Sequence, residues 1–252
     1  HPVKELSDFL KSYDIHINYD AAHVAGLIVG GKFQDPLREG VDTMTMSTHK
    51  TLFGPQGGLV LGSEEHEEII KKATFPGLTS SHHIHHMAGK AVAFAEALEF
   101  GKDYATQVVK NAKSFAEALS DLGFKVLGEK RGFTESHQIA VNVLDYSDGG
   151  KVEADLEKAN IIVNRQLIPG DIKAGRNYFH PSGIRLGVSE ITRLGMKKNE
   201  MQEIASIIKQ VIIEKKDPKK ILVKVKAFRK NFQKVKFCFD NKLGAYEYVK
   251  LR

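Results

Sequence analysis

The sequence contains one cysteine and lacks any long apolar run. Cys238 has no second cysteine in the chain to pair with, so an internal disulfide is excluded and we expect a reducing, cytoplasmic location. No apolar segment approaches the roughly 18 residues that a membrane span requires, which argues against an integral membrane protein. The sequence also lacks an initial methionine and opens inside an amphipathic pattern. We therefore expect that an N-terminal portion is missing.

The positive charge is unevenly distributed along the chain. The formal net charge is +6, and the segment from Lys215 to Lys236 is dense in lysine and arginine, with Asp217 as its one acid. RNA binding by residues 215–252 is one interpretation of such a run. Apolar residues recur through it at helical spacing: Ile221, Val225, Phe228, Phe232 and Val235. This spacing favours an amphipathic helix with a solvated basic face, and nucleic-acid binding stays the less favoured alternative.

Strand-like and helical patterns alternate through the first part of the chain. Alternating or apolar segments predict strands at 15–19, 41–48 and 57–62. Helical patterns cover 2–12 and 87–101, and loops are expected at 21–40 and 75–86. This alternation is typical of an α/β fold with a mainly parallel sheet.

A different pattern follows residue 102. Strands are predicted at 136–144 and 183–189, and helices at 103–122 and 197–214. Short strands covered by helices suggest a smaller α+β domain. We therefore expect two domains, 1–102 and 103–252.

Two of the predicted strands end in side chains suited to one cofactor. Asp20 follows the first strand, and His49 and Lys50 follow the second, at the start of STHKTLFGPQGG. Ligands of open α/β sheets bind outside the carboxyl ends of strands. A lysine there can bind pyridoxal phosphate as a Schiff base, and an acid can keep the pyridine nitrogen protonated so that the ring accepts electrons. A lone strand-end lysine is usually a solvated surface group, so the cluster with Asp20 and His23 carries this interpretation.

Two stretches, YDAAHVAGLIVGGKFQDPL and VDTMTMSTHKTLFGPQGGLVL, resemble serine hydroxymethyltransferases, which are pyridoxal-phosphate enzymes of the aspartate aminotransferase fold type. FPGLTSSHHIHHMAGKAVAFAEAL, EADLEKANIIVN and SGIRLGVSEITRLGM follow in the family's order and spacing. The resemblance covers roughly residues 1–214, and the family's chain is markedly longer at its N-terminus. It implies that 1–102 is the C-terminal half of the cofactor-binding large domain and that 103–252 is the small C-terminal domain.

The resemblance implies cofactor roles for residues near the strand ends. Lys50 matches the Schiff-base lysine, and Asp20 matches the acid that faces the pyridine nitrogen. His23 matches the histidine near the cofactor's phenolic oxygen. Thr48 and His49 precede the lysine at the cofactor's edge. These residues are the expected covalent and polar contacts of pyridoxal phosphate.

The resemblance also implies substrate-binding residues in the second half of the chain. Arg185, in SGIR, matches the arginine that grips the substrate's carboxylate. A planar guanidinium suits that task because it can donate two parallel hydrogen bonds to one carboxylate. Gln166 and Phe179 are further substrate-side candidates.

Some residues depart from the family's pattern. Gln56 stands where the family commonly has arginine, and PGLTSSHH replaces PGxQGGP. In the family, that loop reaches across a homodimer interface to the neighbour's phosphate, and Ser80 and Ser81 retain N–H and hydroxyl donors for this role. The pterin-contacting stretch, VNRQLIPGD, also differs at Arg165 and Gln166. These departures suggest an archaeal-like branch, whose reduced pterin is tetrahydrofolate or tetrahydromethanopterin.

Four histidines in the same loop, at positions 82, 83, 85 and 86, suggest a metal site. No acid or cysteine with ligand spacing accompanies them, and they lie where the family has its interface loop. From the sequence we therefore assign no metal site.

The expected function is reversible transfer of serine's hydroxymethyl group to a reduced pterin, giving glycine, in a homodimer without membrane or nucleic-acid partners. The family's acid–base groups lie mostly in its N-terminal portion, so we expect this chain alone to be inactive and free of cofactor. A pterin-independent threonine or 3-hydroxy amino acid aldolase would use the same lysine, acid and arginine, and it remains the enzymatic alternative.

Overall fold

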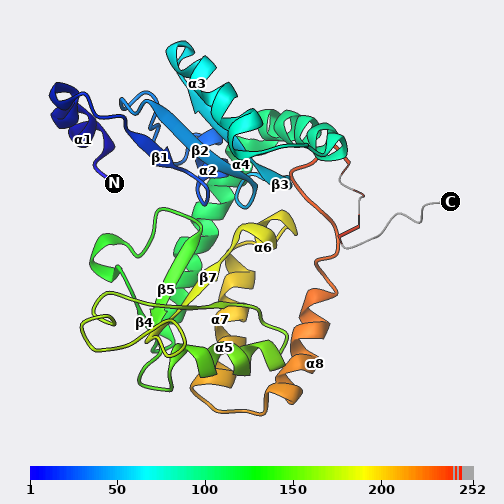
Figure 1. Cartoon of the computed structure of the whole chain (residues 1–252). Helices are drawn as coiled ribbons and strands as arrows, with labels where there is room; N and C mark the ends of the chain where they lie inside the picture. The colour runs from blue at the N-terminus through cyan, green and yellow to red at the C-terminus, as the bar shows by residue number, and fades with distance from the viewer. Residues whose placement is uncertain (241, 243, 246–252) are drawn as a thin grey trace. The chain divides into compact units, whose positions relative to one another are not determined.

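A computed structural model describes residues 1–240, 242, 244 and 245 (Figure 1). The chain divides into two compact units, His1–Ala105 and Thr106–Arg252. The division falls within one helix, α4 (Ile84–Asp121), close to the boundary predicted after residue 102. The cofactor-binding and small-domain roles of the two units stay predictions.

The first unit is built on a three-stranded mixed sheet in the order β1-β2-β3. Its strands are β1 (Asn18–Asp20), β2 (Thr43–His49) and β3 (Phe53–Gly62). β1 and β2 pair in parallel, whereas β3 folds back antiparallel onto β2. The first pairing is parallel, as predicted, and the second is antiparallel because the short connection between β2 and β3 permits only a hairpin.

The α-helices of the first unit are α1 (Val3–Leu10), α2 (Ala25–Val29), α3 (Glu67–Lys72) and the first part of α4. Two of them, α2 and α4, pack on the sheet through small side chains. Met44 and Met46 project from the buried face of β2, as the alternating sequence of this strand predicts. Ala25 of α2 and Ala97 of α4 join them in one core cluster. Alanine lets these helices approach the strand closely.

Two segments of the first unit differ from the sequence-based expectation. The glycine-containing segment after Asp20 was predicted to be a loop, yet it contains α2. The helices predicted at 87–101 and 103–122 are one continuous helix, α4, despite Gly101. A glycine inside a helix costs only about 1 kcal/mol, and buried residues on both sides of it, such as Ala97 and Tyr104, hold the helix in place.

The second unit contains an antiparallel sheet in the order β4-β5-β7-β6. Its strands are β4 (Lys125–Val126), β5 (Gln138–Asn142), β6 (Asn164–Gln166) and β7 (Gly183–Gly187). Its helices are the rest of α4, α5 (Gly149–Lys158), α6 (Ser189–Arg193), α7 (Lys198–Ile212) and α8 (Pro218–Arg229). This arrangement agrees with the predicted α+β pattern.

Buried polar groups in the second unit are satisfied by specific partners. The amide nitrogen of Asn111, on α4, donates to Thr192 Oγ1 and to the Met196 carbonyl oxygen, both at 2.9 Å. The buried Asp171 carboxylate accepts the backbone N–H groups of Ile168, at 3.1 Å, and of Ser182, at 2.9 Å. These bonds fix the long connection between β6 and β7, which has little regular structure of its own.

The basic C-terminal helix is shorter than its apolar spacing predicts. α8 starts at Pro218, capped by the Asp217 side chain, and ends at Arg229, so Phe232 and Val235 lie outside it. Backbone hydrogen bonds to other segments take the place of a longer helix. Lys234 forms a β-bridge with Gly244, and the Lys236 N–H donates to the Arg193 carbonyl oxygen at 2.7 Å. The end of the basic segment, 246–252, lies outside the described residues.

None of the helices that the structure describes combines the length and the apolar character that a bilayer crossing requires.

Candidate active site

The second half of β2 positions the predicted lysine. Thr48 is buried, and its hydroxyl donates to the Pro55 carbonyl oxygen at 2.7 Å, which ties the strand to the start of β3. His49 is exposed, and its Nδ1 accepts the Gly57 N–H at 3.4 Å. The strand register is irregular between Ser47 and His49. Lys50 follows directly and is half-buried at the turn between the two strands.

The end of β1 places Asp20 beside this strand. In the parallel ladder Asp20 lies opposite Thr45. The next backbone N–H, of Ala21, donates to the Thr45 carbonyl oxygen at 2.8 Å, so the chain continues along β2 beyond the strand end. One carboxylate oxygen of Asp20, Oδ1, accepts the Ala22 N–H at 2.9 Å. This bond fixes the carboxylate at the exposed carboxyl end of β1.

Thr51 joins the two loops. Its hydroxyl donates to the His23 carbonyl oxygen at 2.8 Å and accepts the Gly26 N–H at 3.0 Å. The side chain is fully buried. The loop that carries Asp20 and His23 is thereby bonded to the residue directly after Lys50. The structure thus brings together five predicted cofactor residues: Asp20, His23, Thr48, His49 and Lys50.

The same contact explains why position 26 is a glycine. A Cβ atom at this position would lie 2.1 Å from the Thr51 carbonyl oxygen, far inside any permitted contact, so no side chain fits there. α2 can therefore press directly against the lysine loop. From the sequence, Gly26 is expected to lie in a loop, and Thr51 is assigned no role. The one available signal was the threonine after the lysine in THKT.

The side chains at these loops suit pyridoxal phosphate. Within the described residues the Lys50 ammonium makes no ion pair or hydrogen bond, so it is available to a ligand. Asp20 offers a fixed carboxylate on the neighbouring loop. The pKa of Tyr19, in β1, is raised by burial and by the nearby carboxylates of Glu39 and Asp20. Tyr19 is therefore a neutral phenol at physiological pH.

The loop predicted to reach a partner's phosphate lies apart in the sequence, before α4. A π-helical turn (Ala73–Leu78) fills part of the predicted loop, and Ser80 and Ser81 are exposed in the short irregular segment that follows. No hydrogen bond from either serine hydroxyl occurs within the described part of the chain. Their donors are therefore open to a ligand or to another chain.

The neighbouring histidines form a ring cluster. The ring centroids of His83, His85 and His86 lie 4.4 to 5.4 Å apart. The pKa of His86 is lowered by partial desolvation and by the charges of His85, His83 and Lys90, and a backbone hydrogen bond with Gln56 opposes that effect. His86 is therefore neutral at physiological pH, and the cluster packs at the start of α4.

The predicted substrate residues belong to the second unit. Arg185 lies on β7 opposite Asn164 of β6, and its Nη2 donates to Asn164 Oδ1 at 3.2 Å. This bond orients the guanidinium while leaving other N–H groups available. Asn164 was missed by sequence reasoning, because its partner is defined only by strand pairing.

Gln166 and Phe179 occupy different positions in the same unit. Gln166 ends β6, opposite Gly183, and its amide donates to the Leu167 carbonyl oxygen at 3.1 Å. Phe179 is exposed, with its ring 6.0 Å from that of Tyr178. The guanidinium of Arg165 pairs with Glu153 and lies over the Tyr178 ring. In the stretch predicted to contact a pterin, Arg165 and Gln166 thus have defined polar partners, and the Tyr178 ring lies beside Arg165.

Comparison with known proteins agrees with this geometry. The family model "Serine hydroxymethyltransferase" matches residues 2–208. Proteins of that name from Nitrosopumilus maritimus and Cenarchaeum symbiosum are 92% and 76% identical over 252 residues. The one from Pyrococcus furiosus is 54% identical over 246 residues. Each alignment covers 95% or more of this chain but 57% of the relative, so the chain spans little more than half of their length.

A solved structure shows the same fold. The crystal structure of L-threonine transaldolase from Pseudomonas fluorescens in its internal aldimine state has a TM-score of 0.86 and 34% sequence identity. The match covers 96% of this chain and 55% of that protein. It confirms the predicted α/β fold class of pyridoxal-phosphate-dependent transferases. Together with the family match over residues 2–208, it confirms the resemblance read from the motifs: the chain belongs to the serine hydroxymethyltransferase family.

Proposed function

We propose that the protein to which these residues belong transfers the hydroxymethyl group of serine to a reduced pterin and leaves glycine. The observation that carries the proposal is the bonding of the Asp20–His23 loop to the lysine loop through Thr51. A carboxylate and a lysine on adjoining, mutually fixed loops are what pyridoxal phosphate requires.

In this proposal Lys50 holds the cofactor covalently, and Asp20 keeps a proton on its ring nitrogen. When bound, pyridoxal phosphate supplies an electron sink for the bond that breaks at the amino acid's α-carbon. His23 lies at the cofactor ring, and Thr48 and His49 shape its edge. Ser80 and Ser81 donate to a phosphate group. Each of these roles is taken from the family and rests on the matched motif positions.

Arg185 binds the substrate's carboxylate in the same proposal. Its guanidinium group is partly oriented by the hydrogen bond to Asn164, which lowers the entropy lost when the carboxylate binds. Gln166 and Phe179 lie on the substrate side, where a polar amide and an exposed ring suit a pterin. Fixing the carboxylate sets the direction of the bond that breaks, and such positioning is a large part of catalysis.

We also propose a cytoplasmic homodimer of the archaeal branch. Cys238, the one cysteine of the sequence, is buried and forms no internal disulfide, which fits a reducing compartment. One side of α4 is apolar and exposed, at Ile84, Met87, Ala91, Ala95 and Leu98. These positions recur every three or four residues and so form one stripe. A contiguous exposed apolar stripe favours burial against another chain.

Serine cleavage by the full-length protein, measured with and without reduced pterin, tests the proposed function. We expect glycine formation to depend on tetrahydrofolate or tetrahydromethanopterin, and comparing the two identifies the carrier. Cleavage of serine or threonine at the same rate without either pterin would overturn the transferase and favour the aldolase alternative.

A further inference from the structure

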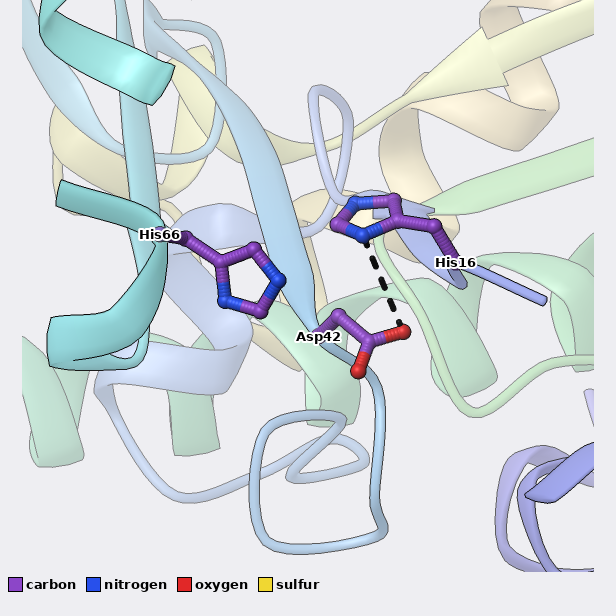
Figure 2. A group of neighbouring side chains, drawn as sticks. All are labelled: His16, Asp42 and His66. Carbon is purple, nitrogen blue, oxygen red and sulfur yellow. Dashed lines mark ion pairs between the residues drawn. The ribbon is translucent and has the colours of Figure 1, made fainter. Parts of the chain in front are cut away.

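Three side chains far apart in the sequence converge at one end of the first unit's sheet (Figure 2). His16 precedes β1, Asp42 precedes β2, and His66 ends the short 3-10 helix that follows β3. Each offers one ligand atom, and these atoms all lie within 4.8 Å of one another. Lys50 follows the opposite end of β2, so this group plays no part in the site described above.

The hydrogen bonds of His16 determine which ring nitrogen is bare. The Thr43 hydroxyl has one proton, which it donates to Asn18 Oδ1 at 3.0 Å. At its 2.9 Å contact with His16 Nε2, Thr43 Oγ1 must therefore accept, so Nε2 carries the proton. In the neutral ring Nδ1 then has a free lone pair. That nitrogen faces Asp42 Oδ2 at 3.9 Å.

His66 is oriented by the same logic. The Ser63 hydroxyl donates its proton to Glu65 Oε1 at 3.0 Å. It must therefore accept from His66 Nδ1, which lies 2.8 Å away. The bare nitrogen of His66 is Nε2, and Figure 2 shows a ring nitrogen of His66 pointing towards His16 and Asp42.

Asp42 completes the group with a fixed carboxylate. Its Oδ2 accepts the Ile17 N–H at 2.6 Å, so the side chain cannot turn away from the two rings. Two imidazole lone pairs and a carboxylate therefore point into one gap with no proton between them. Three acceptors facing one another repel, and a cation relieves that repulsion.

The donor set selects the class of cation. Two nitrogens and one carboxylate oxygen suit zinc and similar transition-metal ions, whereas magnesium and calcium prefer oxygen ligands. A ligating histidine usually donates its other N–H to an outer partner, as both rings do here. The His16, Asp42 and His66 side chains are 51%, 34% and 17% exposed, so water can supply the remaining ligand.

We propose that His16, Asp42 and His66 bind a divalent transition-metal ion of the zinc class. The ion would tie the segment before β1, the start of β2 and the turn after β3 to one another. Its role is structural: it closes one end of the sheet whose other end carries Lys50. The sequence alone gave no sign of this site, because the ligands follow no spacing motif.

Cobalt and zinc binding to the full-length protein test the proposal. Cobalt should bind at one equivalent per chain with visible absorption bands, and zinc should displace it and raise the midpoint of thermal unfolding. His66→Gln should lower the zinc affinity by more than the roughly 10–100-fold that loss of an outer partner costs. Thr43→Val, which removes the outer partner of His16 and the hydroxyl bond to Asn18 but none of the three ligands, should fall within that range.

Matched variants separate this site from the other histidines. His83→Gln with His86→Gln should leave the one-equivalent site unchanged, although it alters the histidine cluster before α4. Asp42→Asn keeps an acceptor for the Ile17 N–H but removes the charge, and should weaken zinc binding while the apoprotein's circular dichroism is unchanged. Unaltered zinc affinity in both His66→Gln and Asp42→Asn, or equal loss in the His83/His86 variant, would overturn the proposal.

Discussion

Thr51 shows how much one hydroxyl can do beside the lysine proposed to hold the cofactor. It donates to the His23 carbonyl oxygen, at the end of the Asp20–His23 loop, and accepts the N–H of Gly26 in α2. Since it is fully buried, water cannot replace either bond. The position of Lys50 relative to Asp20 therefore depends on a residue that need not touch the cofactor itself.

Replacing Thr51 should separate this bridging role from simple packing. Thr51→Val keeps the side chain's shape but deprives the Gly26 N–H and the His23 carbonyl oxygen of their partner. At about 1–3 kcal/mol for each stranded group, we expect the free energy of unfolding to fall by about 2–6 kcal/mol. Thr51→Ser keeps the hydroxyl and should lose only about 1 kcal/mol, from the missing methyl group. Equal stability of the two variants in urea unfolding would contradict the bridge.

The assignment of Lys50 is open to a direct test. In the full-length protein, Lys50→Ala should abolish the visible absorbance of lysine-bound pyridoxal phosphate and reduce turnover by orders of magnitude. The alanine side chain has no amine that could bind the cofactor covalently. Lys32→Ala, at an exposed lysine of the same unit, is the control and should leave both unchanged. Normal absorbance in Lys50→Ala would mean that another lysine carries the cofactor.

Among the connecting elements, the segment between β6 and β7 depends on Asp171. Burial opposes ionisation of this carboxyl, but hydrogen bonds from Ser182 and Ile168 and the nearby charge of Arg176 outweigh it, so its pKa is lowered. A lowered pKa in the folded state stabilises the fold above the unfolded carboxyl's pKa, about 4. That contribution is lost as the pH falls through the folded-state pKa.

Asp171→Asn should therefore destabilise the protein at pH 7, by about 1–3 kcal/mol. The difference from the unmodified protein should shrink as the pH falls from about 4, the unfolded carboxyl's pKa, through the lowered folded-state pKa, below which the unmodified carboxyl is also neutral. Asp145→Asn is a matched control, because Asp145 forms an exposed pair with Lys125 at 2.7 Å. Such an exposed pair contributes little to stability, because solvent screens it. A pH-independent difference for Asp171→Asn in thermal unfolding would show that its charge is not the cause.

For helices and strands, the sequence predicted which elements exist better than it predicted where each one begins and ends. The alternating pattern of β2 located the strand and the lysine after it. α2 was missed because its glycine at position 26 resembles a turn signal, and only the contact with Thr51 explains it. α8 was predicted too long because apolar spacing continues to Val235, while tertiary backbone bonds end the helix at Arg229.

For the whole molecule, the motifs placed the five proposed cofactor residues on two loops that the structure shows to adjoin. This placement could be predicted because the succession of the strands along the chain, and the residues at their ends, are visible in the local sequence. Asn164 beside Arg185, and His16 beside His66, could not be predicted in this way. Each pair is created by long-range packing that leaves no pattern in the residue spacing.

Association of two chains should depend on the exposed stripe of α4. Ile84 and Leu98 are 75% and 87% exposed, and burying such side chains favours association by about 1.5–3 kcal/mol each. Leu98→Glu should therefore shift the full-length protein towards the monomer in analytical ultracentrifugation. Glu99→Gln, at the next exposed position of α4, should not. A purely dimeric Leu98→Glu variant would place the interface elsewhere.

The Thr51 bridge also bears on how the protein assembles during synthesis. The groups that Thr51 joins lie 25 and 28 residues away in the chain. Closing loops of this size costs little entropy, and contacts of short sequence separation form quickly. The loops that carry Asp20 and Lys50 can therefore lock together while later segments, Arg185 among them, are still to be translated.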